Sequence, residues 1–201
     1  MGQLILLRHG ETEWSAAGRH TGRTDIPLTP LGEAVAAELA GPISRRPIRA
    51  AFTSPAKRTV RTAELAGLGD VTPDPDLWEW DYGGYEGRTS AEIRLERPGW
   101  YLWREGVIPG DAEHPGENIA QVGARADAVL SRVRPLLEEN GGDVVLVAHG
   151  HIMRVLAARW LGLEPADGRL FRLDTGTIST LGAEHNEPVI ITWNVHPLAS
   201  E

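Results

Sequence analysis

The sequence predicts an α/β protein built on a parallel sheet, and three observations support this. Two apolar runs, Leu4–Leu7 and Val144–Ala148, have the composition of strands buried on both faces of a parallel sheet. Segments with helical spacing of apolar residues alternate with the strand candidates along much of the chain. The chain has 201 residues, enough for one α/β domain with a full core and too few for two large ones. We therefore expect a single domain over residues 1–201.

The first strand candidate is followed by a loop and a helix. Residues 10–28 are rich in Gly, Thr, Arg and His without an apolar period, which indicates a loop over the strand end. Thr29 suits a helix N-cap with Pro30 at the first helical position. The apolar face of this helix is expected to carry Leu31, Val35 and Leu39 at four-residue spacing. Gly41 and Pro42 are expected to end it.

A short strand at Ala50–Thr53 leads into a second helix. Ser54 and Pro55 repeat the pattern of a cap followed by proline, so we expect the helix to run from there to about Gly67. Arg58 lies in its first turn, and helical side chains lean toward the amino terminus of their helix. Arg58 is therefore expected to lean toward the strand end, where the helix terminus also favours an anion.

Residues 68–117 form the irregular part of the chain, with several prolines and most of the tryptophans. A stretch of this length and aromatic content is expected to be ordered and functional, and we interpret residues 84–117 as an insertion that covers the substrate. Helical spacing from Asn118 to about Glu139 then predicts the longest helix, in which Pro135 is the place for a kink. Gly141 and Gly142 are expected to end it.

The strongest strand signal, Val144–Ala148, stops at His149 and Gly150, much as the first strand stops at Arg8 and His9. Apolar spacing predicts a following helix, and two late strands complete the expected elements. The helix is carried by Ile152, Val155, Leu156 and Trp160, and the strands are Thr177–Leu181 and Val189–Trp193, joined by a turn around His185 and Asn186.

Composition excludes several classes of protein. The net charge is −8, with 28 acidic against 20 basic residues, which argues against a general nucleic-acid binder. The chain has no cysteine, which excludes disulfides, thiolate nucleophiles and cysteine-ligated metals. The apolar run before Arg8 is too short for a signal peptide or a membrane span. We expect a cytoplasmic protein without nucleic-acid or membrane partners; the sequence does not indicate its oligomeric state.

Charged and imidazole side chains gather at the predicted strand ends. Arg8 and His9 follow one strand, Arg58 follows another and His149 a third, and ligands of open α/β sheets bind at such ends. A guanidinium group binds phosphate through two parallel hydrogen bonds, and an imidazole can attack phosphorus. Removing one such charged donor from a phosphoryl-transfer site typically costs about 3 kcal/mol of barrier. These residues therefore predict a phosphoryl-transfer site without metal.

A histidine nucleophile and a departing alcohol set two further requirements. The nitrogen of His9 that does not attack needs a hydrogen-bond acceptor, for which we expect a backbone carbonyl in the loop after Gly10. The leaving alkoxide needs a general acid. The aromatic stretch at residues 76–87 offers three carboxyl groups, Glu79, Asp81 and Glu86, and the residues alone do not choose among them.

Six motifs occur in an order and spacing that span nearly the whole chain. They are Leu7–Thr12 (LRHGET), Gly22–Thr29 (GRTDIPLT), Thr53–Arg58 (TSPAKR), Glu79–Gly87 (EWDYGGYEG), Pro115–Glu117 (PGE) and Val147–Gly150 (VAHG). Together they resemble the successive motifs of the histidine phosphatase superfamily, the phosphoglycerate-mutase-like family. One Arg-His-Gly triplet arises by chance in many proteins, whereas six motifs in order are highly specific.

The resemblance implies a fold and a set of roles. It implies a three-layer α/β/α sandwich with a mostly parallel central sheet, and neither cofactor nor metal. It makes His9 the phosphorylated nucleophile and Glu79 the acid that later acts as base, with Arg8, Arg58 and His149 holding the phosphoryl group. The expected phosphate-binding set is Arg8, Ser15, Thr21, Gly22, Arg58, His149 and Gly150. Ser15 and Thr21 stand where family members commonly carry Asn and Gln.

The function implied is that of a metal-independent phosphomonoesterase acting on a sugar phosphate or another small phosphorylated metabolite. Residues 79–87 are similar to a branch containing acid phosphatases and sedoheptulose-bisphosphatase-like enzymes. A phosphoglycerate mutase using the same phosphohistidine and a non-catalytic phosphate-binding scaffold are the alternatives. The substrate is not specified by the sequence. The basic side chains offered for a second phosphate or carboxylate are Arg88, Arg94, Arg97 and Arg104.

Several other residues are expected to have structural roles. His149 and His151 resemble a metal-binding pair, but no third and fourth ligands stand at a recognisable spacing, so His151 is expected to be structural or to lie behind the site. His20 and His114 are expected at the surface of the loops that frame the pocket, where either could contact the substrate without being a catalyst. Tryptophans expected to pack in the cover are Trp78, Trp80, Trp100 and Trp103, and carboxylates expected to order loops are Glu11, Asp81 and Glu86.

Overall fold

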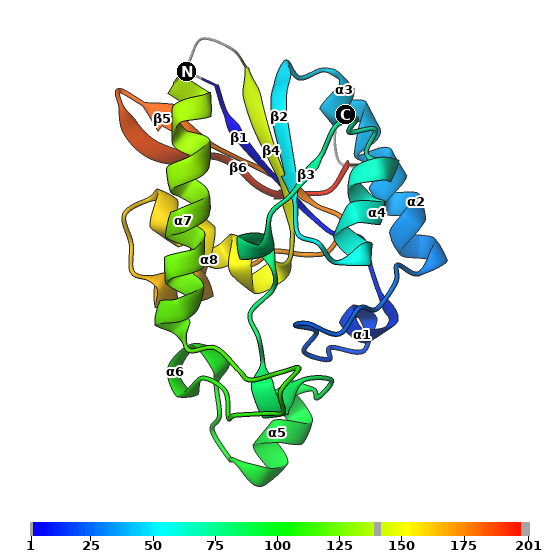
Figure 1. The fold of residues 1–201 in the computed structure, drawn as a ribbon, viewed down its shortest axis with the longest axis vertical. Coiled ribbons are helices and arrows are strands. Elements are labelled where there is room, and N and C mark those ends of the chain that lie inside the picture. The colour runs from blue at the N-terminus through cyan, green and yellow to red at the C-terminus, as the bar shows by residue number, and fades with distance from the viewer. Residues whose placement is uncertain (1, 139–141, 198–201) are drawn as a thin grey trace.

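The computed structural model describes residues 2–138 and 142–197. Within these residues the centre of the molecule is a six-stranded sheet in the order β3-β2-β4-β1-β5-β6 (Figure 1). The strands are β1 (Leu4–Arg8), β2 (Ile48–Thr53), β3 (Thr72–Pro73), β4 (Asp143–Ala148), β5 (Ile178–Glu184) and β6 (Glu187–Val195). The first four are parallel, whereas β5 and β6 are antiparallel to their neighbours. The prediction of a mostly parallel sheet is confirmed.

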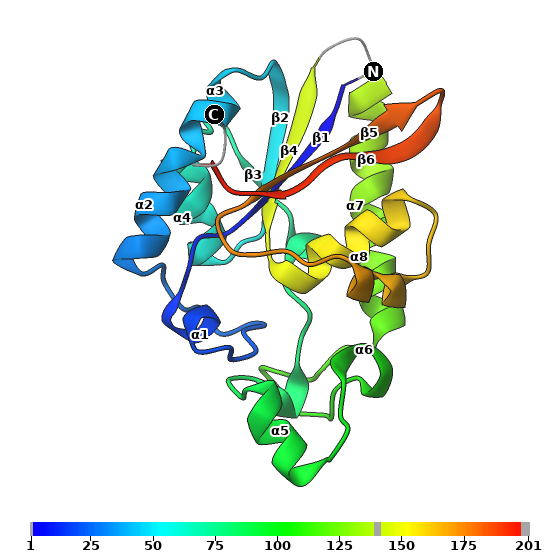
Figure 2. The ribbon, with the colours of Figure 1, turned by 180° about the vertical axis from the view of Figure 1, so that it is seen from behind.

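Helices cover both faces of the sheet and give three layers. On one face lie α7 (Ile119–Glu138) and α8 (Gly150–Trp160), and on the other α2 (Pro30–Glu38), α3 (Ala40–Ser44) and α4 (Lys57–Leu65) (Figures 1 and 2). Alternate residues of β1 point to opposite faces of the sheet. Leu4 and Leu6 pack in the core under α7 and α8, and Ile5 and Leu7 pack in the core on the other face. Since both faces are covered, β1 is apolar at consecutive positions.

The helix after Thr29 begins as predicted but differs in two details. The Thr29 hydroxyl accepts a hydrogen bond from the Gly32 amide. Leu31, however, is 60 % exposed, and the buried residues of α2 are Gly32 and Ala36. The reason is a close backbone approach, since a Cβ on Gly32 would lie 2.1 Å from the Glu11 carbonyl oxygen. The helix is also not ended by Gly41 and Pro42, which enter α3, because proline is tolerated in a first helical turn.

The second predicted helix starts later than expected. α4 begins at Lys57, and its N-cap, Ala56, makes no side-chain capping bond. The prediction that Ser54 caps this helix is wrong, because its hydroxyl bonds the imidazole of His149 instead. Arg58 nevertheless lies in the first turn, as predicted.

The carboxyl-terminal elements follow the expected order. Pro135 lies inside α7, and Glu139 and Gly141 fall outside the described residues. β5 and β6 form a hairpin whose turn residues, His185 and Asn186, have φ of 51° and 68°. Two-residue hairpin turns of this kind require positive φ at both positions. No helix in the described part of the chain combines the length and the hydropathy of a membrane span.

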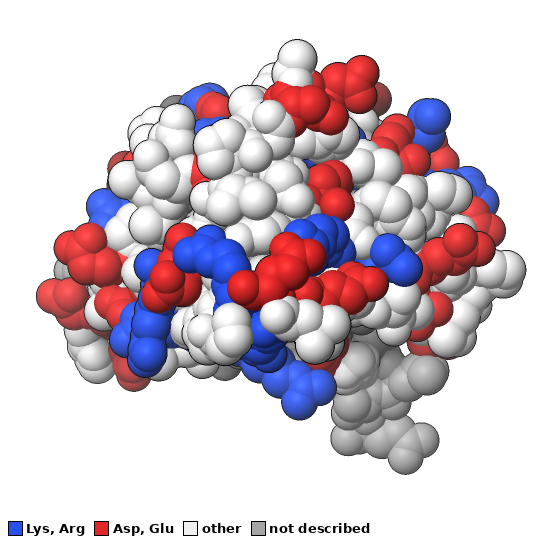
Figure 3. Space-filling model, turned by 90° about the horizontal axis from the view of Figure 1, so that it is seen from below, with Lys and Arg blue, Asp and Glu red and all other residues white. Residues whose placement is uncertain are grey.

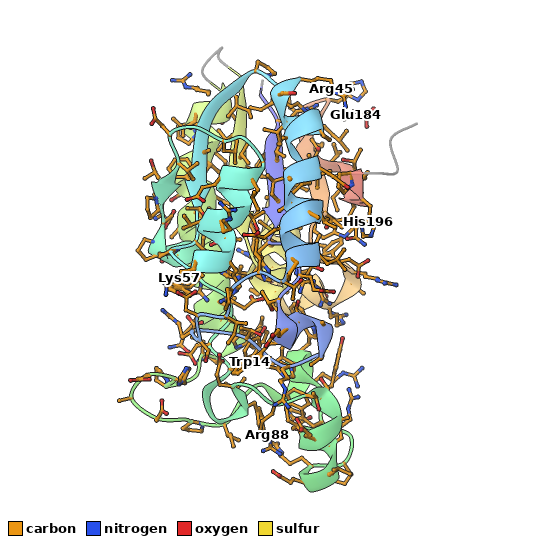
Figure 4. The ribbon with its side chains drawn as sticks, turned by 90° about the vertical axis from the view of Figure 1, so that its right-hand side faces the viewer. Trp14, Arg45, Lys57, Arg88, Glu184 and His196 are labelled. Atoms are coloured by element: carbon orange, nitrogen blue, oxygen red, sulfur yellow. The ribbon has the colours of Figure 1, made fainter. Side chains whose placement is uncertain are left out.

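Residues 84–117, the covering segment, lie at one end of the molecule, beyond the carboxyl ends of the parallel strands (Figure 1). The stretch 68–117, predicted to be irregular, contains short elements: β3, the 3-10 helices η1 (Pro75–Leu77) and η2 (Gly83–Tyr85), α5 (Ser90–Glu96) and α6 (Leu102–Glu105). Trp80, Trp100 and Trp103 are buried, as expected for packing residues. The loop that carries the short helix α1 (Glu13–Ala16) meets this segment where the Trp14 ring approaches Gly87 (Figure 4).

Candidate active site

The carboxyl ends of three neighbouring strands bring the predicted site residues together. Arg8 is paired with Ala148 between β1 and β4, and Val147 with Thr53 between β4 and β2. The residues that follow each strand therefore meet at one edge of the sheet. The rings of His9 and His149 lie with their centroids 5.2 Å apart.

His9 has one nitrogen fixed and one free. Its side chain is buried, and Nδ1 lies 2.7 Å from the carbonyl oxygen of Gly10. Because a carbonyl only accepts hydrogen bonds, Nδ1 carries the proton and Nε2 keeps its lone pair. The acceptor is thus the carbonyl of Gly10 itself rather than one further along the loop. Burial, followed by the positive charges of Arg58 and Arg8, lowers the pKa of His9 well below its usual value, so the ring is neutral at neutral pH.

Arg58 is a fully buried cation without an acidic hydrogen-bond partner among the described residues. Its Nε donates to Nδ1 of His149 at 3.1 Å, and its terminal nitrogens donate to the carbonyl oxygens of Thr24 at 2.9 Å and Gly22 at 3.0 Å. Burial lowers the pKa of Arg58 from its ordinary value, and a guanidinium group stays charged in proteins. Carbonyl dipoles therefore hold this charge in place without neutralising it.

Arg8 is the second cation beside His9. Its guanidinium donates to the carbonyl oxygen of Leu173, and its Nε has no partner among the described residues. Gly150 packs against it, since a Cβ there would lie 3.1 Å from Cζ of Arg8. Burial lowers the pKa of Arg8 from its ordinary value. Two guanidinium groups, neither hydrogen-bonded to a carboxylate of the described residues, thus lie near the neutral imidazole of His9, which creates a site for an anion.

His149 is fixed through both ring nitrogens. Arg58 Nε only donates, so Nδ1 of His149 accepts, and its Nε2 carries the proton that is donated to Ser54 Oγ at 2.8 Å. The ring is stacked parallel to Trp78, and burial and Arg58 lower the pKa of His149 well below its usual value. A phosphoryl group that binds His149 must therefore compete with Ser54. Sequence reasoning missed Ser54, although its place directly after β2 puts it at the same sheet edge.

Glu79 lies at the amino terminus of α8 and lines the pocket with His9. One carboxylate oxygen accepts from the amide of His151 at 2.9 Å, and the other from the amides of Ile152 at 2.8 Å and Trp80 at 2.9 Å. These three backbone donors fix the position of the carboxyl group at the end of a helix dipole.

The other two carboxylates offered by the sequence have ordering contacts instead. Asp81 accepts from the backbone amides of Gly83 and Gly116, and Glu86 accepts from those of Gly22 and Thr24. Neither lines the pocket that holds His9. Position in the structure therefore favours Glu79 as the acid, in agreement with the motif.

Of the other residues expected to bind phosphate, Ser15 and Thr21 lie in the pocket beside His9 and Gly22 lies outside it. Ser15 and Thr21 line the pocket, but the Ser15 hydroxyl is bonded to the backbone of Thr12 in a capping box. Gly22 does not line it: its amide donates to Glu86 and its carbonyl oxygen accepts from Arg58. The contacts of Gly22 do not support the predicted phosphate contact, because its polar groups are already used to hold Arg58 and the loop.

A pocket of about 340 Å³ opens beside His9 and extends to the covering segment. Tyr82, His151 and Arg154 are among the lining residues that were not proposed as site residues from the sequence. The Tyr82 hydroxyl lies 2.7 Å from Nδ1 of His151, which gives His151 the structural contact that was expected. Arg154 follows Gly150 by four residues, so its position on the pocket side of α8 was readable from helical spacing.

His20 also lines the pocket, whereas His114 bonds Asp111 in the covering segment. Within the part of the chain that the structure describes, no three His, Cys, Asp or Glu side chains are grouped as metal ligands. His149 and His151 face different partners, Ser54 and Tyr82, and so do not form the pair that their spacing suggested.

Comparison with known proteins agrees with this arrangement. A Mycobacterium tuberculosis protein named acid phosphatase is 42 % identical over 188 residues, which cover 91 % of this chain and 87 % of that protein. Sedoheptulose 1,7-bisphosphatase of Saccharomyces cerevisiae is 36 % identical over 79 % of this chain and 67 % of its own length. A solved structure of an open reading frame product from M. tuberculosis superposes with a TM-score of 0.89 at 37 % identity, covering 98 % of both chains. The family model described as histidine phosphatase superfamily (branch 1) matches residues 4–196, and the chain belongs to that superfamily.

Proposed function

We propose that the protein is a phosphomonoesterase that works through a phosphohistidine at His9. One observation carries this proposal: His9 has a neutral imidazole with an unprotonated Nε2, close enough to the guanidinium groups of Arg8 and Arg58 for both charges to lower its pKa. Within the described residues neither guanidinium is hydrogen-bonded to a carboxylate. A phosphoryl group suits such a site, because the two guanidinium groups neutralise its charge and Nε2 of His9 can attack its phosphorus.

In the first step, Nε2 of His9 attacks phosphorus, and the new P–N bond forms as the P–O ester bond breaks. Arg8 and Arg58 neutralise the charge on the equatorial oxygens. Protonated Glu79 gives its proton to the leaving alcohol oxygen. In the second step, Glu79 takes a proton from water, the resulting hydroxide attacks phosphorus, and inorganic phosphate leaves as the P–N bond breaks.

The substrate class rests on the pocket and on the relatives. A pocket of about 340 Å³ admits a small metabolite rather than a macromolecule. Two relatives named above are phosphatases, one of them for a sugar bisphosphate. A cytoplasmic location and the absence of nucleic-acid and membrane partners stay predictions from the sequence, supported by the net charge of −8.

The proposal is tested with His9→Asn, and His185→Asn is the matched control because His185 is exposed in the β5–β6 turn. With p-nitrophenyl phosphate, we expect His9→Asn to lower phosphate release by roughly three orders of magnitude or more, and the control to keep wild-type turnover. Acid-quenched wild-type enzyme should carry an acid-labile phosphoryl group that His9→Asn lacks. Wild-type turnover by His9→Asn would overturn the mechanism.

The same preparation separates the alternative functions. With 3-phosphoglycerate, a phosphatase releases inorganic phosphate, whereas a mutase produces 2-phosphoglycerate without releasing it. A scaffold that only binds phosphate would show neither product and no phosphohistidine. Release of phosphate together with a phosphorylated His9 supports the proposal over both alternatives.

A further inference from the structure

The pocket carries more positive charge than one phosphoryl group requires. Among the described residues, four arginines line it, Arg8, Arg19, Arg94 and Arg154, against the single carboxylate of Glu79. The chain as a whole has a net charge of −8, so this excess is local. Within the described residues, the hydrogen bonds of these four arginines go to backbone carbonyl oxygens and not to acids.

Arg154 is the most firmly fixed of the cations outside the phosphoryl site. Its Nε donates to the Gly168 carbonyl oxygen at 3.1 Å, and its guanidinium lies over the Trp103 ring at 4.7 Å from the centroid. It is half-buried on α8, and burial lowers its pKa, although the nearby Tyr101 and Glu79 act in the opposite direction. Within the described residues no acid is hydrogen-bonded to Arg154, and a partly desolvated, oriented cation of this kind is suited to bind an anion.

Arg94 approaches the same pocket from the covering segment. Its Nε donates to the Trp100 carbonyl oxygen at 3.0 Å, and its terminal nitrogens have no partner among the described residues. Two other arginines of this segment are used differently, since Arg88 pairs with Glu96 and Arg97 with Glu105. Of the four arginines that the sequence offered for a second anion, only Arg94 lines this pocket.

The outer surface shows how charge is otherwise distributed. On the face at this end of the molecule, basic and acidic side chains lie next to one another in a band beside a broad area without charge (Figure 3). On this face basic side chains mostly lie beside acidic ones, and Arg88 and Glu96 of the covering segment form an ion pair. The uncompensated arginines of the pocket are a property of the site.

We propose that Arg154 and Arg94 bind a second anionic group of the substrate, so that the substrate is a phosphate monoester that also carries a carboxylate or a second phosphate. This inference rests on the proposed function, in which Arg8 and Arg58 bind the phosphoryl group that is transferred. Arg154 lies one helical turn beyond Gly150, which packs on Arg8. One turn is roughly 6 Å along the helix, a spacing that a small metabolite with two anionic ends can bridge.

The test compares two matched pairs of substrates. 3-Phosphoglycerate and glycerol 3-phosphate differ by a carboxylate, and fructose 1,6-bisphosphate and fructose 6-phosphate differ by a phosphate. For wild-type enzyme, we expect kcat/KM for the doubly anionic member of at least one pair to exceed that of its partner by about 10- to 100-fold, the range of a charge-assisted hydrogen bond. The pair that shows the preference identifies the second anion.

Three variants locate the preference. Arg154→Met and Arg94→Met should each lower the ratio of kcat/KM within that pair by about 10-fold, chiefly through KM. Arg159→Met is the control, because Arg159 lies on the same helix but pairs with Asp127 at 2.8 Å, and it should keep the wild-type ratio. Since each ratio is taken on one preparation, a partial loss of folded protein cancels. Arg154→Lys should restore part of the ratio because it restores the charge.

Two results would overturn the inference: a wild-type enzyme that hydrolyses both members of each pair equally, or a preference that persists in both Arg154→Met and Arg94→Met. Should Arg154→Met not be obtained as folded protein, Arg94→Met decides, because Arg94 is exposed on a short helix. Failure of the proposed function would look different, since no substrate would then give phosphate release that depends on His9.

Discussion

Replacing Ser54 by alanine tests whether the imidazole of His149 is held as the structure indicates. The Ser54 hydroxyl is buried and lies 2.8 Å from Nε2 of His149. The other nitrogen of the ring accepts from Arg58, so Nε2 is the protonated atom. The substitution therefore leaves the N–H group of a fully buried imidazole without its protein acceptor.

The expected cost follows from that single lost contact. Leaving a buried donor unsatisfied costs about 1–3 kcal/mol. The second bond of the Ser54 hydroxyl, from the Ala56 amide, is long at 3.4 Å and adds little. For a chain of this size, each kcal/mol lowers Tm by about 2–4 °C. We therefore expect the free energy of unfolding of Ser54→Ala to fall by about 1–3 kcal/mol and Tm to fall by at least about 2 °C.

Chemical denaturation at pH 7.5 measures this free energy, and turnover of p-nitrophenyl phosphate reports the effect on the site. Ser131→Ala is the control, because Ser131 is exposed on α7 and bonds only the carbonyl oxygen of Ala128; its free energy of unfolding should stay within about 0.5 kcal/mol of wild type. An unfolding free energy for Ser54→Ala that equals the control, with unchanged turnover, would refute the inferred tautomer and the role of Ser54.

Two other predictions follow from the same site. Arg58→Lys removes the fork that reaches three partners at once, so kcat/KM for p-nitrophenyl phosphate should fall by on the order of 10²–10³; a fall of less than tenfold would contradict the role of Arg58. Burial lowers the pKa values of His9, His149 and His151 well below 6.5. Below pH 6.5 the unfolded chain therefore binds more protons than the folded protein. The free energy of unfolding then decreases as the pH falls toward the pKa values of the folded protein. Urea unfolding between pH 7.5 and 5.5 should show this loss, and His151→Asn should make its slope shallower by up to about 1.4 kcal/mol per pH unit; equal slopes would show that His151 does not titrate as described.

The elements that position the site were predictable from the sequence because their environment is uniform. β1 and β4 are covered on both faces, so Leu4–Leu7 and Val144–Ala148 are apolar at every position and the two strands are visible without an alternating pattern. The ends of these apolar runs are equally visible, because Arg8, His9 and Gly10 directly follow the first run and His149 and Gly150 directly follow the second. Parallel strands place such ends at one edge, which is why the meeting of His9 with His149 could be foreseen.

Contacts between distant parts of the chain were not predictable in the same way. Ser54 has the local pattern of a helix cap, yet its partner His149 lies 95 residues away. Leu31 has the spacing of a core residue, but the approach of Gly10 and Gly32 turns another face of α2 inward. In each case local propensity and tertiary packing disagree, and packing contributes the larger free energy.

The position of Glu79 connects the chemistry to the covering segment. The amide of His151 donates to Glu79, and the His151 ring is bonded to the Tyr82 hydroxyl. The ring of His20 packs edge-on against Tyr82, and its Nδ1 lies 2.7 Å from the carbonyl oxygen of Arg88 in the covering segment. A leaving alcohol must face its general acid, and on the proposed mechanism it departs on the side of the pocket that this segment closes. On this mechanism the group attached to phosphate faces both Glu79 and the covering segment, whereas the phosphoryl group is held by residues at the sheet edge.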